Sequence, residues 1–188
     1  MRRLKDLNVA SVSLAFPGND PGTLGHLVYQ IHHDAVALGV TSITALALQT
    51  LHVAAHFDAI ERRILPALQG GTWVILDRFW WSTWVYGIHQ GIAPDYLEAI
   101  IEAERVRWGS VKPDLLLMVD RAEAIRAEHD AGSFTRLRTL YKTMAAREQK
   151  QYQIATVEND DFDRSAEMVW SQIRSLVSNE PTQRTENL

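Results

Sequence analysis

The sequence contains no cysteine, no long apolar run and no block of basic residues, and each absence excludes a class of protein or site. Without cysteine the chain forms neither disulfides nor thiolate sites, so a reducing compartment is compatible and we expect a cytoplasmic protein. No apolar segment approaches the roughly 20 residues that a membrane span needs, so no membrane partner is expected. The net charge of −4 and the lack of a basic block disfavour DNA or RNA as a partner.

What the sequence does contain is enough apolar material for one sizeable core. Of its 188 residues, 46% are hydrophobic, which is ordinary for a globular chain and favours a single domain, placed here at residues 1–177. Residues 178–188 are polar and are expected to form a flexible tail.

The predicted strands and helices alternate along the chain. Strands are expected at residues 9–16, 72–77, 114–120 and 154–157. Helices are expected at 23–31, 42–68, 82–90, 95–108, 121–128, 134–144 and 165–177. This alternation predicts an α/β fold whose mostly parallel sheet is covered by helices on both faces. The continuous apolar run Leu115–Val119 indicates a strand that is buried on both sides.

The most informative segment is the strand at 72–77 and the turn that follows it. Its apolar residues deliver Asp77-Arg78-Phe79 to the carboxyl end of the strand. A carboxylate there can meet a metal ion, and a guanidinium can hold a phosphate through two parallel hydrogen bonds. Ser82 and Tyr86 follow on the next predicted helix. The cluster suits nucleotide chemistry, yet the sequence has no Gly-x-x-x-x-Gly-Lys-Ser/Thr loop for a second set of phosphates.

Taken in order, the motifs resemble the thymidylate kinase family of nucleoside monophosphate kinases. The matching pieces are Phe16-Pro17-Gly18 with Pro21-Gly22-Thr23-Leu24-Gly25, Leu51 through Ala54-Ala55, Ile64-Leu65-Pro66-Ala67-Leu68 with Gly70, Val74 through Phe79 with Ser82-Thr83 and Tyr86, Pro113-Asp114-Leu115 with Val119-Asp120, and Phe134, Arg138 and Tyr141. The likeness runs from residue 1 to about 177. It implies a P-loop kinase-like fold and transfer of the γ-phosphoryl group of ATP to a nucleoside monophosphate such as dTMP, with Mg²⁺.

The resemblance also implies roles for individual residues. Arg78 would hold the acceptor phosphate, and Asp77 would organise Mg²⁺ indirectly. Arg126 would be a catalytic arginine at the start of the lid, with Arg121, Arg136 and Arg138 as further lid cations.

The remaining implied residues bind the acceptor nucleotide. Phe16, Pro17 and Gly18 would shape the rim of its site, and Ser82 and Tyr86 would lie near the base and sugar. His56 occupies a helix position where the family commonly has an arginine facing the base. Asn19 likewise stands where members often have an arginine, so the base and phosphate contacts are altered.

The resemblance further implies that the first, central strand and its phosphate loop are absent from this chain. One hypothesis is that the true start lies upstream, and its rival is that the loop is lost and the strands at 72–77 and 114–120 pair directly. Residues 1–188 alone would then show little or no kinase activity. The alternative function is a non-catalytic relative that binds a nucleotide or a protein, and the long helices suggest a possible homodimer.

Several residues have a structural interpretation beside the functional one. Arg78 could pair with Asp77 or Glu61, and Ser82 could cap its helix. His52 and His56 lie four residues apart and could hold a metal, although a solvated or site-lining pair is favoured. Trp80, Trp81 and Trp84 could stack on a base, although packing is favoured.

Overall fold

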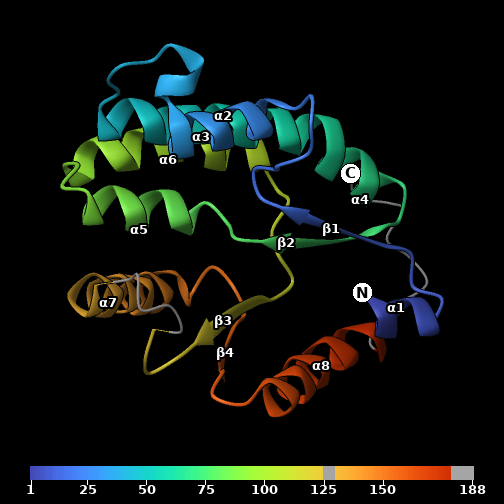
Figure 1. Ribbon diagram of the computed structural model, residues 1–188. Coiled ribbons are helices and arrows are strands. Elements are labelled where there is room, and N and C mark those ends of the chain that lie inside the picture. The colour runs from blue at the N-terminus through green and yellow to red at the C-terminus, as the bar shows by residue number, and fades with distance from the viewer. Residues whose placement is uncertain (125–129, 179–188) are drawn as a thin grey trace. The chain divides into compact units, whose positions relative to one another are not determined.

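The computed structural model describes residues 1–124 and 130–178 and divides them into two compact units (Figure 1). Unit 1 comprises residues 1–109, and the described part of unit 2 comprises residues 110–124 and 130–178. The single domain at residues 1–177 stays a prediction. In the described ranges no helix combines the length and the apolar character that crossing a membrane requires.

The elements follow the alternation that the sequence predicts. Unit 1 contains α1 (Arg2–Asp6), β1 (Ser11–Ala15), α2 (Leu24–Asp34), the 3-10 turn η1 (Val36–Leu38), α3 (Ala45–Ala59), the π-helical turn η2 (Ile60–Ile64), α4 (Leu65–Gln69), β2 (Trp73–Asp77), α5 (Trp81–His89) and α6 (Pro94–Trp108). Unit 2 contains β3 (Leu116–Asp120), α7 (Ala131–Glu148), β4 (Ile154–Glu158) and α8 (Phe162–Ser178). The predicted α/β fold is confirmed.

Local chemistry explains where the helices of unit 1 begin and change. The hydroxyl of Thr23 accepts a hydrogen bond from the backbone N–H of His26 and so caps α2, and Thr44 caps α3 in the same way. Pro66 has no backbone N–H, and its ring crowds the carbonyl four residues earlier. The long helix accordingly widens into the π turn η2 just before this proline and continues as α4.

Each unit contains one parallel pair of strands. In unit 1, β1 pairs with β2 so that Ala15 lies opposite Asp77. In unit 2, β3 pairs with β4 so that Asp120 lies opposite Glu158. Among the described residues these are the only sheets, and the direct pairing of the strands at 72–77 and 114–120 stays a hypothesis.

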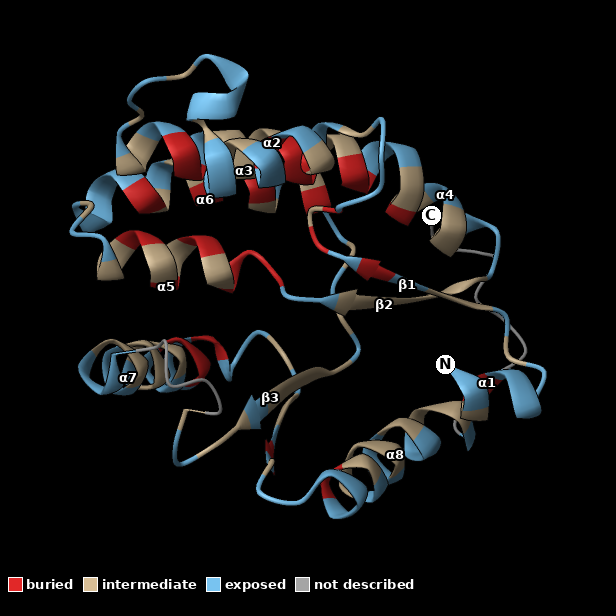
Figure 2. Ribbon diagram, in the orientation of Figure 1, coloured by how far each residue is buried: buried red, intermediate tan, exposed pale blue. Residues whose placement is uncertain are grey.

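The best-buried part of the molecule lies among the helices of unit 1 (Figure 2). Leu97 and Ile101 of α6 are fully buried, as are Val85 of α5 and Ile60 of η2. Helix α3 packs against α2, α5 and α6, so a layer of helices stands beside the carboxyl ends of β1 and β2. This packing fixes the side chains that line those strand ends.

Unit 2 departs from two predictions. The prediction that the strand at 114–120 is buried on both faces is wrong, because Val119 is 55% exposed and the other residues of β3 are half-buried. Within a two-stranded sheet, β3 has only one strand neighbour and little cover. The predicted helix at 121–128 is also not formed at residues 121–124, and its remainder, including Arg126, lies outside the described residues.

Candidate functional site

The two bends predicted to form the site lie side by side in unit 1. Ala15 ends β1 opposite Asp77 at the end of β2, and the N–H of Phe16 donates to the carbonyl oxygen of Asp77 at 2.9 Å. Since the strands are parallel, their carboxyl ends reach the same edge of the sheet. The pairing thus brings the Phe16–Gly18 bend beside Arg78, from segments about sixty residues apart.

The bend after β1 is held closely against helix α2. Gly18 adopts a φ of 121°, which residues with a Cβ rarely tolerate. A Cβ added at Gly25 of α2 would lie 2.6 Å from the Gly18 carbonyl oxygen, so only glycine permits this approach. The Phe16–Pro17 peptide bond is cis. On the far side of the bend, Asp20 forms an ion pair with Arg63.

Arg78 has an unusual backbone conformation. Its φ is 78°, in the left-handed region that costs a non-glycine residue roughly 1–2 kcal/mol. Such outliers gather at functional sites because the surrounding structure holds them for a purpose other than stability. Its guanidinium carbon lies 5.5 Å from the centre of the Tyr86 ring on α5, in a cation–π arrangement. Glu61, one of the partners considered for Arg78, forms an ion pair with Arg107 at 2.7 Å.

Two imidazoles lie within electrostatic reach of Arg78. His32 of α2 and His52 of α3 bring Nδ1 and Nε2 to 3.2 Å of each other. Burial first, and then the charges of His56, His32 and Arg78, lower the pKa of His52 to about 4. Burial, His33 and Arg78 also lower the pKa of His32. Both rings are therefore neutral at pH 7 and leave Arg78 as the cation here.

His56 belongs to a separate, buried arrangement. Its Nδ1 lies 2.6 Å from Oε2 of Glu104 on α6, and the other carboxylate oxygen accepts from Nε1 of Trp108 at 3.2 Å. His56 and Glu104 are 3% and 0% exposed. The Phe16 ring stacks on the imidazole with centroids 4.1 Å apart and an interplanar angle of 16°. His52 and His56 thus have different partners, and the metal pair is not formed.

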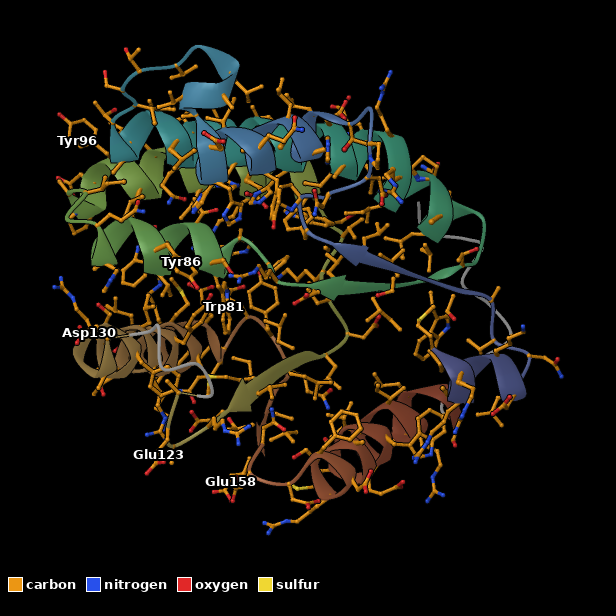
Figure 3. All side chains as sticks on the ribbon, viewed as in Figure 1. Trp81, Tyr86, Tyr96, Glu123, Asp130 and Glu158 are labelled. Atoms are coloured by element: carbon orange, nitrogen blue, oxygen red, sulfur yellow. The ribbon has the colours of Figure 1, made fainter. Side chains whose placement is uncertain are left out.

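Helix α5 supplies Ser82, Tyr86, Trp81 and Trp84. Figure 3 labels Trp81 and Tyr86. The N-cap position is Trp80, so the capping role considered for Ser82 is wrong. Trp80 is fully buried beneath the guanidinium of Arg105, 4.5 Å from its ring centre, and Trp84 donates to Glu98 at 2.9 Å. Packing, the favoured role of the tryptophans, is confirmed for Trp80 and Trp84.

The carboxyl end of β3 in unit 2 holds an ion cluster. Asp120 accepts two hydrogen bonds from Arg138, at 2.6 and 2.9 Å, and lies 3.0 Å from Nζ of Lys142. The hydrogen bonds from Arg138, followed by those from Lys142, hold the pKa of Asp120 far below its ordinary value. Arg138, expected as a lid cation, is therefore engaged with Asp120. Arg126 lies outside the described residues.

The donor set available to a metal ion is small. Asp77 is exposed at the end of β2, and a Mg²⁺ ion typically takes one or two carboxylates together with substrate phosphates. Over residues 1–124 and 130–178 no three His, Cys, Asp or Glu side chains converge on a common point. Asp77 could act as one carboxylate toward a phosphate-bound ion, but these residues do not form a metal site by themselves.

The main residue that sequence reasoning missed is Glu104. It lies on the predicted helix at 95–108, where its charge looks like a solvated helix charge, and instead it is fully buried against His56. The one signal was the i, i+4 spacing of Glu104 and Trp108, which places a carboxylate beside an indole N–H. Nothing in the sequence indicated the contact of His32, whose Nδ1 lies 3.2 Å from Nε2 of His52.

Comparison with known proteins gives one consistent result. The sequence model of a family described as thymidylate kinase matches residues 3–169. A thymidylate kinase of Bradyrhizobium sp. (strain ORS 278) is 38% identical over 63% of this chain and 49% of its own length. Thymidylate kinases of Nitrobacter winogradskyi and Bradyrhizobium diazoefficiens are 30% and 32% identical over 96% and 92% of this chain, and over 83% and 79% of their own lengths. The chain thus spans about half of the first relative and about four fifths of the other two.

Proposed function

Because the chain belongs to the thymidylate kinase family, we propose that unit 1 binds the phosphate-accepting nucleotide, a nucleoside monophosphate such as dTMP. In this proposal Arg78 holds the phosphate. A planar guanidinium offers two parallel N–H donors, which match two phosphate oxygens.

The single observation that carries the proposal is the conformation and setting of Arg78. The residue is held with a φ of 78° at the carboxyl end of β2, directly beside the Phe16–Gly18 bend. In parallel α/β sheets, ligands bind outside the carboxyl ends of the strands. The lowered pKa values of His32 and His52 keep these two rings neutral at pH 7, whereas the Arg78 guanidinium stays charged, as phosphate binding requires.

The other implied residues take roles around this phosphate. Phe16, Pro17 and Gly18 form the rim, and Gly25 brings α2 directly onto the carbonyls of Pro17 and Gly18. Tyr86 keeps the Arg78 guanidinium in place through its ring face. Ser82 stands one turn earlier on α5 and would contact the sugar or base.

The proposal extends to ATP and Mg²⁺ as the phosphoryl donor and its metal ion. The family transfers a phosphoryl group, and Asp77 would orient Mg²⁺ or water near it, with Arg126 neutralising the developing charge. Residues 1–188 contain no Gly-x-x-x-x-Gly-Lys-Ser/Thr loop, and Asp77 alone is not a metal site. These residues do not fit ATP–Mg²⁺ by themselves, and no step through that complex is derived.

That missing motif favours a second candidate function for the polypeptide 1–188. It is a nucleotide- or protein-binding relative that retains Arg78 and transfers no phosphoryl group. A homodimer and a cytoplasmic location also belong to the proposal.

Titration calorimetry of the purified polypeptide with dTMP tests the binding role. We expect saturable binding that Arg78→Ala weakens by at least about tenfold, the range of a charge-assisted hydrogen bond. Arg62→Ala is the matched control, because Arg62 is an exposed arginine of the same unit that pairs with Asp58 at 3.5 Å. Absence of dTMP binding by the unmodified protein, or equal effects of the two substitutions, would contradict the proposal.

An assay of ATP-dependent dTMP phosphorylation separates the two candidates. Little or no turnover by a polypeptide that binds dTMP supports the binding relative. Measurable turnover, lost in Arg78→Ala and retained in Arg62→Ala, supports the kinase.

A further inference from the structure

The strongest unassigned feature of unit 1 is the contact between the rings of His32 and His52. His32 lies on α2 and His52 on α3, and Nδ1 of the first ring is 3.2 Å from Nε2 of the second. The ring centres are 5.4 Å apart, and the ring planes make an angle of 66°. The two imidazoles therefore meet through edges that carry nitrogen, and not through their faces.

Two packed helices hold these rings near each other. Helix α2 packs against α3. Val28, which precedes His32 by one turn on the same helix face, is buried, and so is Val53, which follows His52 directly. The His32 ring itself is exposed and the His52 ring is half-buried. The backbone positions are thus fixed, while an ion from solvent can reach the pair and the exposed ring can rotate toward it.

The spacing of the two nitrogens fits a transition-metal ion. Neutral imidazole is a common metal ligand, and its nitrogen binds Zn²⁺ at about 2.0–2.1 Å. Two ligands of a tetrahedral ion at that distance lie roughly 3.3–3.4 Å apart, close to the 3.2 Å between these nitrogens. A neutral ring can offer the lone pair of one nitrogen and carry its proton on the other. Whichever nitrogen donates in the contact without metal, binding requires only a change of tautomer.

We propose that His32 and His52 together bind a divalent transition-metal ion, Zn²⁺ or an ion of similar ligand preference. Over residues 1–124 and 130–178 no group of three His, Cys, Asp or Glu side chains could hold a metal, so water takes the remaining positions. Such a two-ligand site binds more weakly than zinc sites with three or four protein ligands. Mg²⁺ prefers oxygen ligands and should not compete for it.

Arg78 opposes this ion until its own charge is neutralised. After burial and the neighbouring imidazoles, the charge of Arg78 helps to lower the pKa of both His32 and His52, so it acts on both rings. The same repulsion disfavours a divalent cation. A phosphate on Arg78 removes the repulsion, a step that rests on the proposed function. Metal ion and phosphate should then strengthen each other's binding by the same factor.

Calorimetric titration of the purified protein, without a histidine tag, with ZnCl₂ tests the site. We expect saturable binding of one ion, weakened at least about tenfold by His32→Gln or His52→Gln. His26→Gln is the matched control, because His26 lies on the same helix and its Nδ1 contacts the Asn19 side chain at 3.0 Å; its affinity should stay within about twofold. Equal affinities in all three variants would mean an adventitious ion only and would overturn the inference, as would absence of binding.

A double variant shows whether both rings hold the same ion. If they do, each single substitution already destroys the joint grip on the ion. The loss of binding free energy in His32→Gln with His52→Gln should therefore be smaller than the sum of the two single losses. Fully additive losses would indicate separate ions and refute the shared site. Should His52→Gln not fold, the exposed His32→Gln still decides the outcome against His26→Gln.

Titration of Zn²⁺ at saturating dTMP tests the coupling, with free Zn²⁺ corrected for its complex with dTMP. The affinity should rise by about threefold at low ionic strength. Arg78→Ala should raise the Zn²⁺ affinity of the nucleotide-free protein, whereas Arg62→Ala, an exposed arginine paired with Asp58, should not. An affinity that neither dTMP nor Arg78→Ala raises would contradict the coupling.

The outcomes also separate this inference from the proposed function. Zn²⁺ binding that needs both imidazoles, in a protein that does not bind dTMP, retains the metal site and refutes the proposed function. Binding of dTMP that depends on Arg78, in a protein without Zn²⁺ binding, refutes the metal site and leaves the proposed function intact.

Discussion

The two units treat their charged side chains in opposite ways. Unit 1 places the Glu104–His56 pair in its interior, where the two side chains are 0% and 4% exposed. Unit 2 places Asp120, Arg138 and Lys142 at the end of β3, where the two cations are 35% and 47% exposed. Burial fixes the orientation of the two side chains, because a pair removed from water has few alternative geometries. A surface pair, by contrast, exchanges its contacts with water and salt ions.

The apolar cores differ in the same sense. In the described parts of the chain, the buried apolar side chains of unit 2 are Met144, Ala145 and Val157, whereas most helices of unit 1 contribute to its core. The larger apolar core of unit 1 indicates that this unit has the rigidity that a precise binding site requires. Substitutions in unit 1 should therefore have large effects on stability, and surface substitutions in unit 2 small ones.

The largest effect is expected for Glu104→Ala. The substitution leaves Nδ1 of His56 and Nε1 of Trp108 buried without the carboxylate that they contact and removes a fully buried side chain, which should lower the free energy of unfolding of unit 1 by about 2–5 kcal/mol. Urea unfolding followed by tryptophan fluorescence measures it, because five of the six tryptophans lie in residues 1–109. Glu102→Ala is the control: that side chain is 63% exposed, and the change should stay within about 0.5 kcal/mol. If the two substitutions lowered the free energy of unfolding equally, burial would not explain the role of Glu104.

The second-largest effect is expected for a glycine of unit 1. Gly25→Ala forces a Cβ to 2.6 Å from the backbone oxygen of Gly18, which should cost about 2–3 kcal/mol and loosen the Phe16–Gly18 bend. In α7 of unit 2, Gly132→Ala meets only the side-chain oxygen of Asp130 at 3.2 Å, and a helical alanine is favoured over glycine. We expect this second change to be nearly neutral by the same urea titration. A larger loss from Gly132→Ala would contradict the assignment of rigidity to unit 1.

The pH dependence of stability gives a third, intermediate effect. The pKa of His52 is about 4 in the folded protein against an ordinary value of 6.5, so the unfolded chain binds the proton first as the pH falls. Stability is then full above pH 6.5 and is lost as the pH drops toward 4, by up to about 3 kcal/mol. His52→Gln should flatten this part of the curve, measured as thermal unfolding between pH 7 and 4.5. An unchanged slope in His52→Gln would assign it to other groups.

The smallest effect is expected for Asp120→Asn in unit 2. The carboxylate gives up its charge toward Arg138 and Lys142, so stability should fall slightly at low salt and hardly at all in 1 M salt. In the unmodified protein the low pKa of Asp120 means that this contribution is present above its ordinary pKa and is lost only in acid. Hydrogen exchange of β3 amides measures the change. A loss that salt does not alter would show that this cluster behaves like the buried pair of unit 1.

Much of the fold could be predicted from the sequence because its signals are local. Strands at 72–77 and 154–157 depend on short runs of strand-forming residues, and the start of α2 depends on the hydroxyl of Thr23; the structure has these elements within one or two residues of their predicted places. The exposure of β3 could not be predicted in this way. Its run Leu115–Val119 is apolar on both faces, but burial depends on which segments cover the strand.

The candidate site was predictable to a similar degree. Arg78, Asp77 and the Phe16–Gly18 bend were found because each follows a strand, and the structure brings them together through the pairing of β1 with β2. Their chemical roles remain predictions. Glu104 and His32 could not be found, since their partners His56 and His52 are 48 and 20 residues away in the sequence.

By itself the sequence determined the order of strands and helices, the strand-end position of Arg78 and the membership of the thymidylate kinase family, because periodicity, turn residues and motif order are properties of neighbouring residues. Only the tertiary structure decided which charges are buried and which imidazoles meet. Those outcomes depend on helix packing, where α6 brings Glu104 against α3 and so fixes His56 beside Phe16. Desolvation, which acts on a side chain only once its surroundings have assembled, is the physical reason for the difference.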